Sequence, residues 1–382
     1  MVAVGTFSFF MNSLVRYFIP SLLPVIEELD GISIVKASLL VTAYWSTYTA
    51  MQIPSGFISD RFGQATVNKA SFLAMTALFS CFLALHSFAG LLAIQLLLGA
   101  SSSLVYISDV SLIQRVSEPS RRAHAVGIYQ TAFFVGASVA EILSVRLLGI
   151  SFRASVLAFM PLMLAACMLN FALLSNPERK GRSRGTVRRE LAYVAAIRFA
   201  SGFTYLGFSS LFAAFIVFRG ITSADSTYRF AWVPIFLGIA GSPLGGVVSR
   251  GITRYKFTVA VAASMALALS VVATGLLPGA WALLTASLSG FFYGLYSGPS
   301  MGLATEVSAG EDALGSASGF VNFSSQLGGS VSPFLIGAMV ASTHSFSIPF
   351  LTVGTVSLAL LIAVYIAGIS GSLGKTGTRG VT

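Results

Sequence analysis

The sequence has few charged residues, and this scarcity excludes an ordinary water-soluble domain. Asp, Glu, Lys and Arg together make up 9% of the 382 residues, whereas soluble domains carry about a quarter. Hydrophobic residues make up 55%, and the mean hydropathy is +0.84. The chain is therefore predicted to be an integral membrane protein surrounded by membrane lipids.

Cysteine and the common catalytic motifs are also scarce. The two cysteines, Cys81 and Cys167, lie inside apolar runs and are expected to be small core residues rather than a disulfide. The sequence has no HExxH motif, no Walker-type glycine loop and no Cys/His metal spacing. The first apolar segment lacks a basic leader, so a cleavable signal peptide is not expected. An enzyme, a metal site and a bound cofactor are not expected either.

Apolar segments long enough to cross a bilayer recur along the whole chain. A membrane-spanning helix needs about 20 such residues, and lipid offers no hydrogen-bond partner to a non-helical backbone. The sequence therefore predicts an all-α membrane protein with twelve transmembrane helices. They are expected at residues 3–26, 33–57, 67–86, 89–113, 122–147, 153–174, 190–217, 228–248, 257–277, 280–304, 313–341 and 346–369.

Positive charge is distributed unevenly among the loops. The net charge is +10, and most of the 23 Lys and Arg residues fall in segments that face one side when both termini share that side. Cytoplasmic loops carry such an excess. We therefore expect a multi-pass plasma-membrane protein with cytoplasmic N- and C-termini. Its basic loops are expected to touch anionic lipid headgroups, not nucleic acid.

The chain divides into two halves of similar length. The polar stretch SNPERKGRSRGTVRRE lies between the sixth and seventh predicted helices, and its dense positive charge is typical of a flexible linker. We expect an N-terminal six-helix bundle at 1–174, a basic cytoplasmic linker at 175–189 and a C-terminal six-helix bundle at 190–382.

An internal repeat relates these halves. Gly127 and Gly136 enclose eight residues in the fifth predicted helix, and Gly319 and Gly328 enclose eight in the eleventh. Matching glycines also occur in the second and eighth predicted helices. The two bundles are therefore expected to be pseudo-symmetric.

The segment SGFISDRFGQ, after the second predicted helix, resembles the signature G-x-x-x-D-R-x-G-R-[KR] of the major facilitator superfamily. The chain supplies Gly56, Asp60, Arg61 and Gly63, but has Gln64 where the family has a basic residue. The resemblance implies two six-helix bundles around a central cavity that opens to each side of the membrane in turn. The first, fourth, seventh and tenth helices would line that cavity.

The resemblance also implies a gate at the cytoplasmic helix ends. The Asp60 carboxyl would face the start of the eleventh helix, whose dipole favours an anion. Arg61 would pair with Asp109, and Arg250 with Glu306. A plain charged loop with side chains that reach the lipid surface is the alternative. The candidate gating residues are Gly56, Asp60, Arg61, Gly63, Asp109, Arg250 and Glu306.

Arg16 is expected near the bilayer midplane, about 16 Å along the first helix from Glu27. A charge there costs several kcal/mol unless it faces water or a counter-ion. Because a guanidinium presents a planar fork of donors that fits carboxylate or phosphate, Arg16 predicts an anionic substrate. A structural ion pair with an intramembrane acid is the alternative. Arg198, in the seventh helix, is expected to reach either the cavity or the membrane surface.

Further polar and aromatic residues lie on the helices that flank the expected cavity. Such side chains in membrane helices face protein or water, and bonding between helices is the alternative to substrate binding for each. The candidate binding residues are Arg16, Tyr17, Tyr106, Arg198, Tyr205, Tyr293, Tyr296, Asn322 and Gln326.

Glu141, in the fifth predicted helix, is the candidate for a proton-coupling residue. A buried carboxyl group can bind and release a proton during transport. A structural ion pair with Arg16 or Arg146 is the alternative.

These observations predict a monomeric secondary active transporter for a small, carboxylate-like organic anion. It would work by alternating access, with H⁺ or another ion coupled to transport in symport. Two alternatives remain open. One is efflux of hydrophobic, drug-like compounds by the same fold, and the other is a membrane sensor or scaffold that transports nothing.

Overall fold

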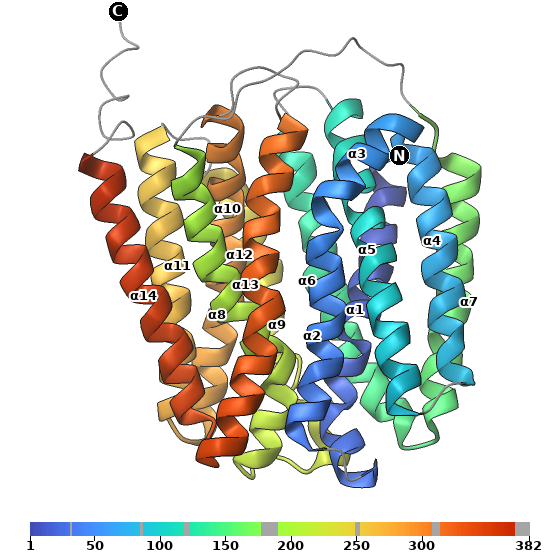
Figure 1. Ribbon diagram of the computed structural model, residues 1–382, viewed down its shortest axis with the longest axis vertical. Helices are drawn as coiled ribbons and strands as arrows, with labels where there is room; N and C mark the ends of the chain where they lie inside the picture. Colours follow the sequence, from blue (N-terminus) through green and yellow to red (C-terminus); the bar gives the residue numbers. More distant parts are fainter. Residues whose placement is uncertain are drawn as a thin grey trace, which may run out of the picture.

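The structure of the protein is a computed structural model that describes residues 1–30, 33–84, 87–117, 122–176, 190–248, 253–307 and 314–370. Long helices run along the bundle axis, and the described residues contain no strand (Figure 1). The expected all-α class is confirmed. The predicted linker at 175–189 lies outside the described residues except at its beginning.

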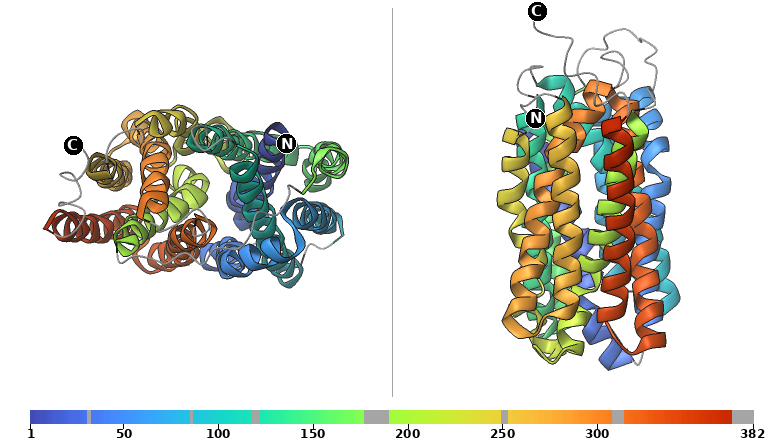
Figure 2. Two further views of the ribbon diagram at one scale, coloured as in Figure 1. Left: turned by 90° about the horizontal axis from the view of Figure 1, so that it is seen from above. Right: turned by 90° about the vertical axis from the view of Figure 1, so that its left-hand side faces the viewer.

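The helices of the first half surround α1 on several sides. Figure 2 shows them from above as one group beside the helices of the second half. The elements are α1 (Val2–Asp30), α2 (Ile34–Ala50), α3 (Gln52–Phe62), α4 (Gln64–Ser80), η1 (Cys81–Leu83), α5 (Phe88–Val116), α6 (Arg122–Leu148) and α7 (Phe152–Leu173).

The second half forms the other group of helices. Its elements are α8 (Leu191–Phe218), η3 (Ala224–Arg229), α9 (Val233–Phe236), α10 (Gly238–Val248), α11 (Thr253–Leu276), α12 (Gly279–Val307), α13 (Leu314–Thr343) and α14 (Ser347–Ser370). The N-terminus and the C-terminal end of α14 lie at the same end of the bundle (Figure 1). This end is called the near end below, and the opposite end is called the far end.

Two of the predicted helices are interrupted. The helix expected at 33–57 is divided at Met51 into α2 and α3, and the one expected at 228–248 is divided into η3, α9 and α10. Pro54 lies in the first turn of α3, and Pro234 lies at the start of α9. Proline lacks the amide donor of the helix and disfavours helical geometry in the residue before it. These positions explain the break before α3 and the break before α9.

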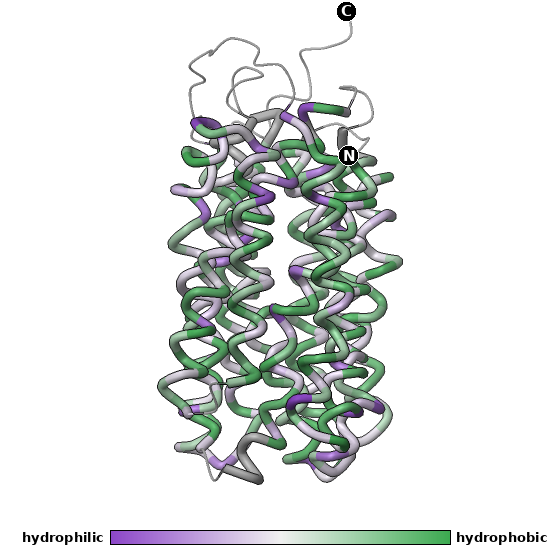
Figure 3. The backbone as a smooth tube through the Cα atoms, turned by 90° about the vertical axis from the view of Figure 1, so that its right-hand side faces the viewer, coloured by the Kyte–Doolittle hydropathy of each residue, from purple (hydrophilic) through white to green (hydrophobic). Residues whose placement is uncertain are grey.

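Most of the described helices suit a bilayer. Nine of the helical stretches in the described ranges are long and apolar enough to cross a membrane. Three of the twelve predicted spans are not among these nine. One is the span formed by α2 and α3 together, and the other two are α12 and α13. The latter two contain 29 and 30 residues and are rich in Gly and Ser, which suits helices that pack against protein. Hydrophilic residues lie mainly toward the bundle ends, and the length between is mostly hydrophobic (Figure 3).

Several pairs of helices join the two halves. α2 and α3 lie against α13, α6 lies against η3 and α10, and α1 lies against α8. Small residues bring the helices close: a side chain at Gly337 would collide with Ser38, and one at Gly238 would collide with the Phe134 ring. A cavity between the halves can therefore be lined by side chains from both.

Candidate functional site

A small cavity lies between the halves. Its volume is about 40 Å³, which is room for a few water molecules at most. Two arginines line it together with amide, hydroxyl and aromatic side chains from α1, α2, α5, α6, α8, α12 and α13. The lining residues are Phe9, Arg16, Tyr48, Tyr106, Gln130, Phe133, Phe134, Arg198, Tyr293, Tyr296, Ser297, Asn322 and Gln326.

Arg16 reaches this cavity from α1 and is 4% exposed. Its guanidinium carbon lies 4.5 Å from the ring centre of Tyr48, 5.0 Å from that of Trp45 and 5.5 Å from that of Phe133. Aromatic faces partly compensate a buried cation without using its N–H donors. Nη2 donates to Asn12 Oδ1 at 3.3 Å, and Nε has no partner among the described residues. Arg16 therefore retains donor capacity for an anion.

Arg198 reaches the same cavity from α8 and is 5% exposed. Its Nη1 donates to Ser300 Oγ and its Nη2 to Asn322 Oδ1, both at 3.1 Å. Nε again lacks a partner within the described part of the chain. Of the two alternatives for Arg198, the structure therefore shows the cavity, and the alternative that it reaches the membrane surface is wrong.

Most of the predicted binding residues do meet at this cavity, but two lie behind its wall. The Tyr17 hydroxyl lies 3.0 Å from Ser209 Oγ of the other half. The Tyr205 hydroxyl donates to the Pro234 carbonyl at 2.9 Å, and its ring stacks on Tyr293 with the centroids 3.9 Å apart. Neither tyrosine lines the cavity. The prediction that each of them contacts a ligand there is therefore wrong. Tyr205 instead supports Tyr293.

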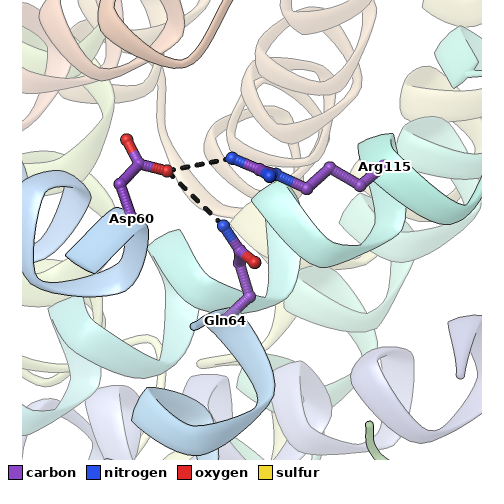
Figure 4. Close-up of polar contacts among 3 residues, drawn as sticks. All are labelled: Asp60, Gln64 and Arg115. Carbon is purple, nitrogen blue, oxygen red and sulfur yellow. Dashed lines mark hydrogen bonds and ion pairs between the residues drawn. The ribbon is translucent and has the colours of Figure 1, made fainter. Parts of the chain in front are cut away.

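The signature segment forms an ion pair different from the expected one. Arg115 Nη2 lies 3.1 Å from Asp60 Oδ1, with the side chains partly exposed (Figure 4). Gln64 Nε2 lies 3.4 Å from the same oxygen. With its amide turned, Gln64 would accept from Nε and Nη2 of Arg115, each at 3.2 Å. Gln64, the departure from the family signature, thus lies against the ion pair and bonds either to Asp60 or to Arg115, according to the orientation of its amide.

The expected pair of Arg61 and Asp109 is absent from the described residues. Asp109 Oδ1 accepts instead from Asn68 Nδ2 at 2.8 Å, and the Arg61 guanidinium lies 5.4 Å from the Phe62 ring centre. Two consecutive helical residues point about 100° apart, which explains why Asp60 rather than Arg61 faces α5. Arg250 and the side chain of Glu306 lie outside the described residues.

The two signature glycines differ. Gly63 has φ +93°, which a residue with a side chain rarely adopts, and an added Cβ would lie 2.6 Å from Asn176 Oδ1. Asn176 Oδ1 accepts from the Ala65 amide at 2.8 Å and so caps the start of α4. Gly56 has open space at its Cβ position, so no close contact of the described residues requires a glycine there.

The chain also matches a known protein family. The sequence profile of the Major Facilitator Superfamily matches residues 5–333. The chain belongs to this superfamily. It is therefore a multi-pass membrane transporter rather than an enzyme.

Two curated superfamily relatives are similar over most of the chain. A hexuronate transporter of Bacillus subtilis is 23% identical over 373 residues, covering 89% of this chain and 87% of the relative. A probable sulfoacetate transporter, SauU, of Cupriavidus necator is 23% identical over 371 residues, covering 87% and 84%.

Solved structures support the superfamily fold. One is a bacterial homolog of the human lysosomal transporter Spinster in its inward-facing, occupied conformation. It aligns with a TM-score of 0.75 at 15% identity and covers 99% of this chain and 98% of its own. The inward-facing, unoccupied structure aligns with a TM-score of 0.70 at 15% identity, covering 96% and 95%. The predicted superfamily fold is confirmed.

Glu141 is buried in α6, behind the cavity wall. It is 1% exposed, and Oε2 has no hydrogen-bond partner among the described residues. Arg146 lies 5.8 Å from the Tyr228 ring centre, and neither it nor Arg16 forms an ion pair with Glu141. The alternative of a structural ion pair with either arginine is therefore wrong.

Sequence reasoning missed several residues that line the superfamily cavity. Tyr48 continues the spacing of Tyr44 and Gln52 along one helix face, and Gln130 occupies the repeat position of Asn322. The spacing of Tyr48 and the repeat position of Gln130 could both be read from the sequence. Phe9, Phe133 and Phe134 carried no signal, because phenylalanine is frequent throughout the apolar helices.

Proposed function

We propose that the protein is a secondary active transporter for a small organic anion that carries a carboxylate or a similar group. The observation behind the proposal is that Arg16 and Arg198, from opposite halves, line one buried cavity. The Asp60–Arg115 pair is the only ion pair among the described residues, so neither cavity arginine has an acidic partner there.

The energetics of the cavity favour an anion. Burying a guanidinium without a counter-charge costs several kcal/mol. A bound carboxylate offsets that cost for both arginines and accepts their remaining N–H donors. The two relatives are named as a hexuronate transporter and a probable sulfoacetate transporter. Both named substrates are anions, which agrees with the charge of the cavity. No Asp or Glu of the described residues lines the cavity, which disfavours a cationic drug.

We infer that transport works by alternating access. The cavity of about 40 Å³ is too small for a hexuronate, so the halves must separate before the substrate enters. Two bonds between the halves would then break. Asn322 Nδ2 donates to Gln52 Oε1 at 2.8 Å, and the Tyr17 and Ser209 hydroxyls lie 3.0 Å apart.

Glu141 is the proposed site of the coupling proton. An unpaired carboxylate in the bundle interior is unfavourable, whereas the neutral acid is tolerated there. Glu141 lies within electrostatic range of Tyr17, whose hydroxyl bonds across the halves. Loss of the proton would place a charge beside that contact.

We propose that both termini are cytoplasmic, as the distribution of basic loops indicates.

Uptake into liposomes tests the anion proposal. Hexuronate, sulfoacetate, a neutral hexose and a lipophilic cation are offered to the wild type and to Arg16→Gln, Arg16→Lys and Arg198→Gln. We expect the two anions to enter, and Arg16→Gln to abolish their uptake. Arg153→Gln is the control, because Arg153 is exposed at the start of α7. Unchanged anion uptake in Arg16→Gln would refute the site, and uptake of the cation alone would refute the substrate class.

A further inference from the structure

A second buried carboxyl group lies in the first half, away from the cavity. Asp109 of α5 and Asn68 of α4 are both 0% exposed, and Asn68 Nδ2 donates to Asp109 Oδ1 at 2.8 Å. α1 covers this pair at Gly5, where an added Cβ would lie 3.2 Å from the same carboxyl oxygen. The pair is therefore enclosed by three helices.

Each residue of the pair also has one side-chain oxygen to which no described group donates a hydrogen bond. Asp109 Oδ2 and Asn68 Oδ1 are both buried and accept no hydrogen bond from the described residues. Two acceptors cannot satisfy each other. A protonated carboxyl group has one O–H donor, so a proton on Oδ2 would provide a donor for Asn68 Oδ1. A carboxylic acid and an amide can then exchange two hydrogen bonds within one planar pair.

Within the described part of the chain, no ion pair holds Asp109 ionised. Arg115, on the same helix, pairs with Asp60. The Lys69 ammonium, next to Asn68 on α4, lies 5.8 Å from the Phe171 ring centre.

The other packed helices contribute neutral groups to this region. Tyr129 of α6 is within electrostatic range of Asp109, and its hydroxyl has no partner among the described residues. Ser8 of α1 donates to Asn170 of α7 at 2.8 Å. A charged carboxylate would thus be buried without a cation, at a cost of several kcal/mol.

We propose that Asp109 and Asn68 form a proton-binding site, separate from Glu141 and the cavity, that holds one proton in this conformation. Binding forms the Oδ2–H bond, and release returns the proton to water. The site lies seven residues before the end of α5, about 10 Å from the near end. The proton would leave toward that end once α1 or α4 moves away and admits water. Its use in transport rests on the proposed function, whereas proton binding itself does not.

Infrared difference spectroscopy of the reconstituted full chain tests proton binding directly. We expect a carbonyl band of a protonated carboxylic acid at neutral pH that disappears in Asp109→Asn and persists in Glu141→Gln. Asp109→Asn should also retain the wild-type melting temperature, because two amides can form the same doubly bonded pair. A spectrum unchanged by Asp109→Asn would overturn the proposal.

A second variant keeps the test valid if Asp109→Asn does not fold. Asn68→Leu removes the partner but keeps the acid, so the band should persist and shift to a higher frequency. An unshifted band would show that Asp109 is not bonded to Asn68.

The use of the site in transport is measured with a pH-sensitive dye trapped in the liposomes. Asp109→Asn should lose part of the substrate-driven proton movement while substrate exchange continues. Absence of any anion transport in the wild type, with the band present, would refute the proposed function alone.

Discussion

Asn322 of α13 donates a hydrogen bond to Gln52 of α3, with Nδ2 and Oε1 2.8 Å apart, across the boundary between the halves. Asn322 Oδ1 accepts from Arg198 Nη2, and Gln52 Nε2 donates to Ser103 Oγ at 3.1 Å. The cavity arginine of one half is therefore connected to α5 of the other by consecutive hydrogen bonds. A ligand that draws Arg198 away from Asn322 would loosen the bond between the halves.

Gln52→Leu should shift the conformational equilibrium toward open forms. A net hydrogen bond contributes about 1 kcal/mol, or about fivefold in the ratio of closed to open molecules. Spin labels at Phe57 and Tyr255, both well exposed on α3 and α11, would report the distance between halves after Cys81 and Cys167 are replaced.

Gln130→Leu is the matched control for this measurement. Gln130 Nε2 donates to the Tyr106 hydroxyl within the first half, at 3.1 Å. Its loss should leave the distance distribution unchanged. A longer distance in Gln130→Leu equal to that in Gln52→Leu would show that the effect is general loosening of the cavity wall.

Trp45 should report ligand binding through its fluorescence. Its ring centre lies 5.0 Å from the Arg16 guanidinium, so an anion bound to Arg16 changes the local field at the indole. We expect a saturable change in emission on addition of a transported anion, lost in Trp45→Phe and in Arg16→Gln. Trp281, 63% exposed at the start of α12, provides the control, and Trp281→Phe should keep the signal. A signal that survives Trp45→Phe would contradict the prediction.

The two signature glycines should respond oppositely to alanine. Gly63→Ala combines a strained backbone, which costs about 1–3 kcal/mol, with a collision against Asn176, so the melting temperature should fall. Gly56→Ala lies in a helix with open space at Cβ and should be neutral or stabilising by up to about 1 kcal/mol. A double-mutant cycle with Asn176→Ala isolates the collision, because the combined loss should be smaller than the sum of the single losses. Additive losses would mean that backbone strain acts alone.

The Asp60–Arg115 ion pair should affect cycling more than stability. Its side chains are 56% and 41% exposed, and exposed ion pairs contribute about 0–1 kcal/mol. Arg115→Gln should therefore leave the melting temperature nearly unchanged and alter the transport rate. The exchanged variant, with Asp60→Arg and Arg115→Asp together, should recover part of the rate. Its failure to do so, with protein of normal stability, would indicate that the charges act separately.

The class of the protein could be predicted from the sequence, because it depends on composition and helix order. Long apolar segments identify the membrane helices, and Arg16 and Arg198 stand out because charge is rare within them. The rotation of a helix about its axis is harder to predict. Tyr17 follows Arg16 directly, yet its hydroxyl points toward α8 while Arg16 faces the cavity.

Pairing between distant helices could not be predicted from the residue types. Arg61 and Arg115 are both arginines near helix ends, and Asp60 and Asp109 are both available acids. The choice of partner depends on burial: Asp109 is covered by α1 at Gly5, whereas Asp60 remains partly exposed beside the end of α5. Such packing is a property of the folded bundle.

The break at Met51 places Gln52 and Asp60 on one separate helix of eleven residues, α3. Gln52 bonds to the opposite half beside the cavity, and Asp60 holds the end of α5 eight residues, or about 12 Å, away. Displacement of α3 as a rigid body would strain both contacts at once. Opening at the near end would then couple the bond between the halves to the position of the end of α5.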